Sequence, residues 1–258
     1  MKIENYGEGK RCAEALRLFL GAEERGELPD WVDRLIILPI PTSRDKATVT
    51  DKKLTLKEVF EGVGKGDVVA GYAIPDGCYD EARARGAVIF DAEKDENFLT
   101  ENARLTALGA LGYILSEIDR EPADISFGVV GYGRIGKIIT RYLLFLGAKI
   151  KIYTSKELSR LQLGECEIST QTTKDGKIDL SGTEILINTA PVRLLDGFSD
   201  GRLPDGVRII ELASGNNFPG IDGIERLPSI PDRFYGKSAG KAYYSAIKKY
   251  MCEGVYSE

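Results

Sequence analysis

Short apolar runs alternate with amphipathic stretches in the first hundred residues of the chain. Apolar positions in the segment 9–20 recur at helical spacing, whereas the runs 34–40 and 67–73 are continuous and of strand length. Continuous runs of this kind are typical of parallel strands that helices cover on both faces. Further helices are expected at 54–63 and 76–85, and a further strand at 87–90. The alternation predicts an α/β domain.

The second half of the chain repeats this alternation after one long helix. The Ala- and Leu-rich segment 97–118 predicts a helix that begins near Thr100, with Glu101 in its first turn. Strands are expected at 125–130, 149–153, 183–188 and 207–212, a helix at 135–146, and a last amphipathic helix from Lys237 onward. The fold class is therefore α/β, with two doubly wound parallel-sheet domains.

The length of 258 residues suits two domains of ordinary size. Residues 1–100 are expected to form a flavodoxin-like substrate domain that the C-terminal helix 240–258 completes. Residues 101–239 are expected to hold the bridging helix and a nucleotide-binding domain.

Composition narrows the classes of function. Lys and Arg total 35 against 40 Asp and Glu, so no basic field exists to attract nucleic acid or an anionic membrane. No apolar run has the length of a membrane span, and the N-terminal segment does not resemble a secretory signal, so a cytoplasmic location is expected. Four scattered cysteines predict no metal site. The chain has no histidine, so any chemistry proceeds without the commonest proton shuttle.

The string GYGRIG at 131–136 lies directly between a predicted strand and a predicted helix. In a dinucleotide-binding turn, Gly131 would permit the tight turn, Gly133 the approach of a pyrophosphate, and Gly136 close packing of helix against strand. The amides at the start of the helix would then face the anion. The second domain is therefore interpreted as a Rossmann domain. An ordinary strand-to-helix turn is the alternative interpretation.

The end of the next strand bears on the choice of cofactor. An NAD-specific site usually has an acid there, but the sequence is Tyr153-Thr154-Ser155-Lys156. Ser155, Lys156 and Arg160 could instead contact a 2′-phosphate, which favours NADP, with NAD possible. Alternatively, the two cations merely begin a solvated helix. The cofactor-binding candidates are Gly131, Tyr132, Gly133, Arg134, Ile135, Gly136, Thr154, Ser155, Lys156, Arg160, Asn188, Thr189, Ala190, Pro191 and Ser214.

Two later strand ends are expected at the same edge of the sheet. Asn188 and Thr189 would line the nicotinamide side, and the loop containing Ser214 is small enough for close approach to the ring or the substrate. Purely structural turns remain an equal alternative for both.

Several stretches in this order resemble the dipicolinate synthase A-subunit family, whose architecture is related to that of the D-2-hydroxyacid dehydrogenases. They are LIILPIP (35–41), ENARLTALGAL (101–111), the glycine turn with its flanking strands (128–152), EILINTAP (184–191), ELAS (211–214) and GKSAG (236–240). The resemblance implies oxidation of a dihydrodipicolinate-type precursor to the pyridine dicarboxylate of bacterial endospores, with NADP as hydride acceptor. It also implies a homodimer through the bridging helix and, as a possible partner, the flavodoxin-like second subunit of dipicolinate synthase.

A dicarboxylate substrate requires cationic and hydroxyl partners, which this interpretation expects in a cleft between the domains. No catalytic residue is assigned. For each binding candidate, an ordinary cap, turn or exposed charge is an alternative role. The substrate-binding candidates are Thr42, Ser43, Arg44, Asn102, Arg104, Thr106, Lys237 and Ser238.

The chain departs from the family pattern in three places. Leu105 and Leu108 stand where the family commonly has Pro and Glu, Gly236 stands where a Pro usually precedes the Lys, and no clear opening strand is expected at the N-terminus. A second hypothesis is therefore a catalytically silent NAD(P)-binding subunit or redox sensor. A third, a D-2-hydroxyacid dehydrogenase-like enzyme, is disfavoured because that reaction uses a histidine.

Overall fold

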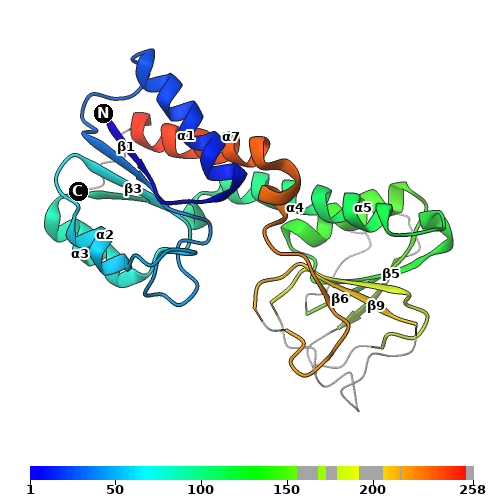
Figure 1. Ribbon diagram of the computed structural model, residues 1–258. Coiled ribbons are helices and arrows are strands. Elements are labelled where there is room, and N and C mark those ends of the chain that lie inside the picture. Colours follow the sequence, from blue (N-terminus) through cyan, green and yellow to red (C-terminus); the bar gives the residue numbers. More distant parts are fainter. Residues whose placement is uncertain (156–167, 173–178, 192–205, 216, 254–258) are drawn as a thin grey trace. The chain divides into compact units, whose positions relative to one another are not determined.

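The structure is a computed structural model that describes residues 1–155, 168–172, 179–191, 206–215 and 217–253. The chain forms two compact units, Met1–Leu105 with Pro231–Glu258 and Thr106–Ile230 (Figure 1). The sequence predicted divisions after residues 100 and 239, whereas the units divide after 105 and 230. Helix α4 (Glu96–Ser116) contributes to both units, and α7 (Ile230–Glu253) belongs almost wholly to the first.

The first unit contains a four-stranded parallel sheet in the order β1-β2-β3-β4. Its strands are β1 (Lys2–Asn5), β2 (Arg34–Ile37), β3 (Asp67–Gly71) and β4 (Val88–Asp91). The expectation that no opening strand is present was wrong, because β1 pairs with β2 from Lys2 opposite Arg34 to Asn5 opposite Ile37. β1 is a half-exposed edge strand with a single apolar residue between polar ones, so it lacks the hydrophobic signal of a covered strand.

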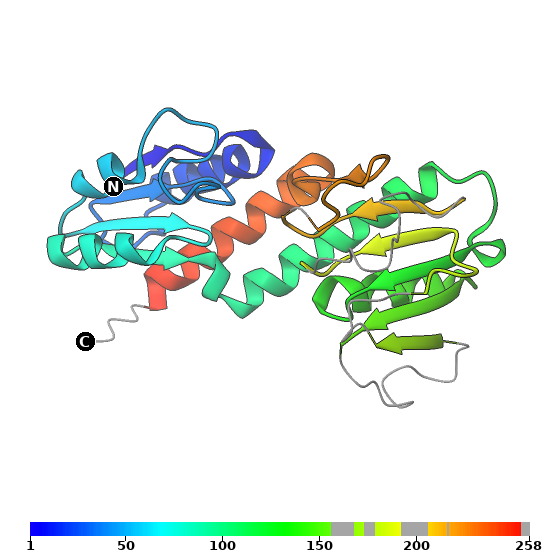
Figure 2. The ribbon, with the colours of Figure 1, turned by 90° about the horizontal axis from the view of Figure 1, so that it is seen from below.

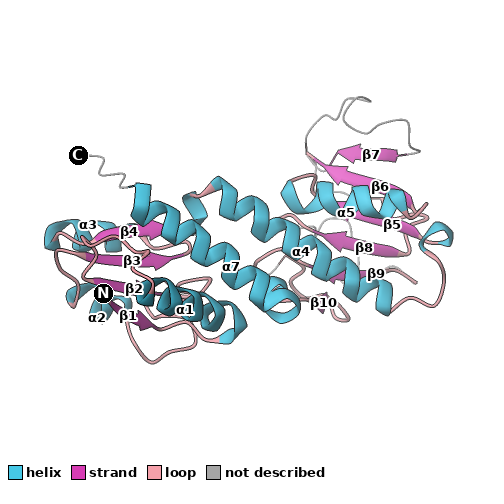
Figure 3. Ribbon diagram, turned by 90° about the horizontal axis from the view of Figure 1, so that it is seen from above, coloured by secondary structure: helices cyan, strands magenta, loops and turns pink. Residues whose placement is uncertain are grey.

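Helices cover both faces of this sheet (Figure 3). On one face, α1 (Gly9–Glu24) and α7 pack on Leu35 and Ile37; on the other, α2 (Leu56–Glu61) and α3 (Asp76–Arg85) pack on Ile36 and Leu38. This two-sided burial explains the continuous apolar run at β2. Since each step along the sheet has the same direction, the crossover through α1 has the opposite hand to those through α2 and α3.

The second unit contains a six-stranded sheet in the order β10-β9-β8-β5-β6-β7, with every pair parallel (Figure 2). The central strand β5 (Ser126–Val130) lies between β6 and β8, so the strand order reverses between β5 and β8. Counted along the chain, this is the order 3-2-1-4-5-6 of dinucleotide-binding Rossmann units. The remaining strands are β6 (Lys149–Thr154), β7 (Ile168–Thr172), β8 (Ile185–Asn188), β9 (Arg208–Glu211) and β10 (Glu225–Arg226).

One face of this sheet is covered by α5 (Arg134–Phe145) and by the part of α4 that belongs to the unit. Ala107, Ala110, Leu111 and Ile114 of α4 are buried against the strands. The Ala- and Leu-rich face that the sequence connected with a homodimer is therefore used in the core of this unit. On the other face, the core includes Tyr153, Leu186, Ile209 and Phe218.

Two predicted helix starts differ from the observed ones. α4 begins at Glu96 rather than near Thr100, and the Asp95 carboxylate accepts a hydrogen bond from the amide of Phe98 at 2.6 Å, as an N-cap does. α7 begins at Ile230, and Tyr235 interrupts it with φ −131° and ψ 41°. Lys237 therefore lies just after a break within a longer helix. Short 3-10 turns occur at Ala92–Lys94 and Pro122–Asp124. None of the described helices is long and apolar enough to cross a membrane.

Candidate functional site

The glycine turn lies at the carboxyl end of β5, beside the reversal of strand order. Gly131 follows the strand with φ +88°, in the left-handed region that favours glycine. Its amide donates to the carbonyl of Tyr153 at 2.8 Å, which ties the turn to β6. Gly133 is the N-cap of α5, and no side chain caps this end of the helix. The amides of the first turn of α5 are thus free of an internal side-chain cap.

The three glycines have different surroundings. A Cβ at residue 131 would lie 2.9 Å from the Ala190 Cβ, and one at residue 136 would collide with the carbonyl oxygen of Gly131. At Gly133, by contrast, a Cβ would meet nothing within 4 Å. The first and third glycines are therefore required by packing, while the second faces open space. This is the division of roles expected when a pyrophosphate approaches the middle glycine.

The loop after β8 supports the turn. The Thr189 hydroxyl donates to the carbonyl of Val130 at 2.8 Å and lies 3.3 Å from the carbonyl of Gly131. A Cβ at residue 131 would also lie 2.9 Å from this hydroxyl oxygen. The side chain of Thr189 thus fixes the backbone of the glycine turn. Pro191, which follows, is exposed.

Asn188 is fully buried, and its side chain binds a carboxylate that the sequence analysis did not single out. Its Nδ2 donates to Glu211 Oε1 at 3.0 Å and Oε2 at 3.2 Å. Glu211, at the end of β9, also accepts from the amide of Ala213 at 2.9 Å and from Asn217 Nδ2 at 3.2 Å. Asn217 Nδ2 in turn lies 3.2 Å from the carbonyl of Ser214. The network fixes both loops; an acid at the end of an otherwise apolar strand was the signal for it.

Burial raises the pKa of Glu211, and the hydrogen bonds from the two asparagines and the Ala213 amide oppose that shift. The carboxylate residue is 3% exposed. Its role in the described structure is to hold Asn188 and the 211–217 loop in place. Ser214 itself is exposed on this loop.

The end of β6 carries no acid among its described residues. Thr154 is buried and Ser155 is exposed, whereas Lys156 and Arg160 lie outside the described residues. Tyr153 is fully buried, with its hydroxyl bonded to the Asp179 carbonyl at 2.7 Å and to the Thr183 hydroxyl at 3.1 Å.

The other candidates of the turn sit around the start of α5. Tyr132 is partly exposed and packs against the core, Arg134 is exposed in the first turn, and Ile135 also packs against the core.

In the first unit, the loop after β2 holds three of the substrate candidates. Thr42 is fully buried: its hydroxyl accepts from the amide of Tyr72 at 2.8 Å and lies 3.4 Å from the carbonyl of Pro39. The Ser43 hydroxyl donates to Asp45 at 3.0 Å, and Arg44 is exposed. Thr42 thus joins the ends of β2 and β3 rather than presenting its hydroxyl to a ligand.

The three candidates on α4 have different partners. Arg104 is exposed and paired with Glu101, with Nε donating at 2.9 Å. Thr106 is 7% exposed and is the first residue of the second unit. Asn102 Oδ1 accepts from Nη2 of Arg11 at 3.0 Å. Asn102 is therefore the candidate of this group that contacts a buried cation.

Lys237 and Ser238 are exposed. The glycines around them explain the GKSAG sequence, because a Cβ at residue 236 would collide with the Lys10 side chain and one at residue 240 would lie 2.6 Å from the carbonyl of Arg11. The motif therefore permits close packing of α7 on α1.

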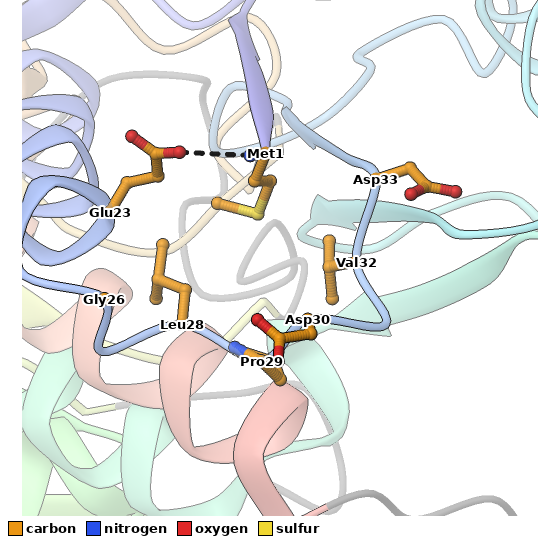
Figure 4. A pocket seen from close by; sticks show the side chains of 8 residues that line it. All are labelled: Met1, Glu23, Gly26, Leu28, Pro29, Asp30, Val32 and Asp33. Atoms are coloured by element: carbon orange, nitrogen blue, oxygen red, sulfur yellow. Dashed lines mark hydrogen bonds and ion pairs between the residues drawn. The ribbon is translucent and has the colours of Figure 1, made fainter.

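A hollow in the first unit is lined by Met1, Glu23 and the loop from 26 to 33 (Figure 4). It lies before the starts of β1 and β2, at the amino ends of the strands, where open α/β sheets do not usually bind ligands. Within the described residues, no group of three or more potential ligands from Cys, Asp and Glu could hold a metal ion.

The strand order and the glycine turn define a Rossmann unit of the kind found in NAD(P)-dependent dehydrogenases. The whole chain shares its fold with D-2-hydroxyisocaproate dehydrogenase, with a TM-score of 0.51 and 13% identity over 100% of this chain and 98% of that one. No protein-family model matches the sequence.

The chain is a divergent relative of the dipicolinate synthase A-subunit. It is 26% identical to the Bacillus subtilis (strain 168) protein over 182 residues, which cover 67% of this chain and 60% of the relative. The matched stretch is thus less than two thirds of that relative. The crystal structure of the A chain of dipicolinate synthase from Bacillus subtilis has a TM-score of 0.73 and 19% identity, covering 98% of this chain and 96% of that one.

Proposed function

We propose that the chain is an NADP-dependent oxidoreductase that oxidises a dihydrodipicolinate-like dicarboxylate. The observation that carries the cofactor part is the open space at Gly133 between two glycines that packing requires. The similarity to the dipicolinate synthase A-subunit supports the substrate part.

The residues present fit a dinucleotide. The uncapped start of α5 and the backbone at Gly133 would hold the pyrophosphate, since helix amides and the helix dipole favour an anion there. Ser155, with Lys156 and Arg160, would bind the 2′-phosphate, and no described residue at the end of β6 is an acid that would repel it. Ala190 and Ser214 would line the nicotinamide side. The bound nicotinamide supplies the hydride acceptor.

The absence of histidine is compatible with this reaction. Oxidation of a dihydropyridine ring removes one hydride and releases one proton, and the gain of aromaticity favours that loss. The chain's own task is to bind and orient the dicarboxylate, which is a matter of position and charge rather than of a strong base. A hydroxyacid oxidation would instead require a residue that takes the hydroxyl proton.

A direct assay tests the proposal. The full chain is incubated with NADP⁺ and enzymatically generated dihydrodipicolinate, and NADPH formation is followed by its absorbance. Turnover is expected, and it should be lost in Gly136→Val but kept in Gly112→Ala, whose Cβ would meet nothing within 4 Å. Confirmed cofactor binding without turnover would contradict the substrate assignment.

Calorimetry of NADP⁺ and NAD⁺ binding tests the cofactor preference separately. Tighter binding of NADP⁺ is expected, because Ser155 stands where a carboxylate would bind the ribose hydroxyls of NAD⁺. Tighter binding of NAD⁺ would remove the argument from the 2′-phosphate.

A second candidate function is a catalytically silent NAD(P)-binding subunit, favoured by Leu108 in place of the family Glu and by the lack of histidine. This function predicts tight cofactor binding with no turnover, and no effect of replacing Arg44 or Lys237.

The proposal also includes two kinds of partner, a second copy of the chain and a flavodoxin-like second subunit. Light scattering of the chain, first without and then with such a flavodoxin-like protein, measures both associations.

A further inference from the structure

Arg11 is a buried cation that the sequence analysis did not single out. It lies in the first turn of α1, and the residue is 6% exposed. Burial lowers the pKa of Arg11, which reflects the cost of removing the guanidinium from water. A buried guanidinium is normally compensated by a paired carboxylate, because an unpaired buried charge is strongly destabilising.

That compensation is incomplete among the described residues. Arg11 Nη2 donates to Asn102 Oδ1 at 3.0 Å, while Nε is buried and finds no hydrogen-bond acceptor. No described carboxylate forms an ion pair with the side chain. Asp232 attracts Arg11 from a longer range, but its Oδ1 accepts from the backbone amide of Arg11, at 2.6 Å. The side chain thus has one neutral acceptor and donor capacity to spare.

The position of Arg11 matches that of a ligand-binding group. α1 follows β1, so its first turn lies at the carboxyl ends of the parallel strands, the edge where open α/β sheets bind ligands. Tyr72, which follows β3 at the same edge, lies within electrostatic range of the guanidinium. The hollow in Figure 4 lies at the opposite edge.

We propose that Arg11, oriented by Asn102, binds a carboxylate group of the substrate in the first unit. This inference rests on the proposed function and names the residue that would recognise its dicarboxylate. The planar guanidinium suits a carboxylate because it offers several donors in one plane, and Asn102 fixes that plane by accepting from one arm. Arg104 is already paired with Glu101, so it offers fewer uncommitted donors.

The test uses pyridine-2,6-dicarboxylate as the probe, with the full chain and saturating NADP⁺. Calorimetry measures probe affinity, and thermal unfolding without the probe measures stability. In Arg11→Met, affinity is expected to fall about ten- to a hundredfold, since a hydrogen bond to a charged group contributes a factor of about ten or more. Stability without the probe should stay equal or rise, because an incompletely compensated buried charge is removed.

Two further variants complete the design. Arg11→Lys keeps the charge but loses the planar donor arrangement, so an intermediate affinity is expected. It also provides a folded protein if Arg11→Met fails to fold. Arg17→Met is the matched control, because Arg17 lies on the same helix, is exposed and pairs with Glu14. It should leave the affinity for the probe unchanged.

The outcomes separate this inference from the proposed function. Lower stability of Arg11→Met with unchanged probe affinity would show a structural role and overturn the inference, while leaving the oxidoreductase intact. If the wild type ignores the probe but binds a monocarboxylate such as picolinate in an Arg11-dependent way, the carboxylate role stands and the dicarboxylate substrate fails. Binding of no carboxylate by the wild type would also overturn the inference.

Discussion

The starts of α1 and α5 are built alike but are closed differently. Each helix follows a parallel strand through a turn that contains a glycine at positive φ, Gly9 at +89° and Gly131 at +88°. Neither N-cap residue, Glu8 or Gly133, forms a side-chain cap, and neither helix has an acid in its first turn. In the first unit, however, the Asp232 carboxylate accepts from the amide of Arg11 at 2.6 Å. At α5, no described side chain does this.

The difference shows how one local geometry serves two purposes. A helix N-terminus attracts an anion through its free amides and its dipole. α1 satisfies this need with an internal carboxylate carried by α7, whereas α5 leaves it to an external anion, with open space at Gly133. The first arrangement contributes stability, and the second provides a binding site. Four changes test this contrast, beginning with the largest expected effect.

Gly136→Val should abolish the α5 site. The new side chain would collide with the Gly131 carbonyl, so the turn and helix must separate. We expect a loss of about 3 kcal/mol in the free energy of unfolding from overpacking, together with loss of NADP⁺ binding. Urea denaturation and calorimetry measure the two effects. Gly112→Ala, with open space around its Cβ, should instead stabilise the protein by about 0.5–1 kcal/mol.

Asp232→Ala should open the start of α1. Removal of the carboxylate leaves the Arg11 amide without its acceptor, and we expect a loss of about 1–2 kcal/mol in the free energy of unfolding. Sulfate should restore part of this stability by occupying the vacated position. Asp232→Asn keeps an acceptor and should lose less. Equal stability of Asp232→Ala and the wild type would contradict the view that the carboxylate closes this helix.

Gly133→Ala should sharpen the contrast, because it changes binding with little change in stability. Residue 133 has φ −85°, which alanine adopts readily, and its Cβ would meet nothing within 4 Å. We expect the free energy of unfolding to stay within about 0.5 kcal/mol of the wild type. NADP⁺ affinity should fall about tenfold or more, since the methyl group would occupy the path of the pyrophosphate. Unchanged affinity would place the pyrophosphate elsewhere.

Hydrophobic pattern was sufficient for the covered strands and insufficient for the edges. Runs such as 34–40 and 125–130 marked β2 and β5 because helices or loops cover both faces of these strands. β1, β7 and β10 lie at sheet edges and were missed, since Ile168-Ser-Thr-Gln-Thr and the two-residue β10 carry little apolar signal. Backbone pairing stabilises such strands, and pairing leaves no periodic trace in the sequence.

For the candidate site, the glycine turn was predictable because strand, glycine spacing and helix are local in sequence. The roles of polar side chains were not. Asn188 was expected to face the nicotinamide but binds Glu211, which is 23 residues away, and Arg11 contacts Asn102 across 91 residues. Such partners are determined by tertiary packing, which spacing along the chain does not report.

The last and smallest effect concerns two carboxylates at neighbouring strands of the second unit. Burial raises the folded pKa of Glu211 above its usual value, so the folded state holds this proton more tightly and loses stability as the pH rises through that range. The Arg208 hydrogen bond lowers the folded pKa of Glu225, so its contribution is lost as the pH falls. Glu211→Gln should therefore reduce the loss of stability on the alkaline side between about pH 4 and 8, and Glu225→Gln the loss on the acid side, as measured by urea denaturation at about six pH values. The same direction of change in both variants would contradict this assignment of the two carboxylates.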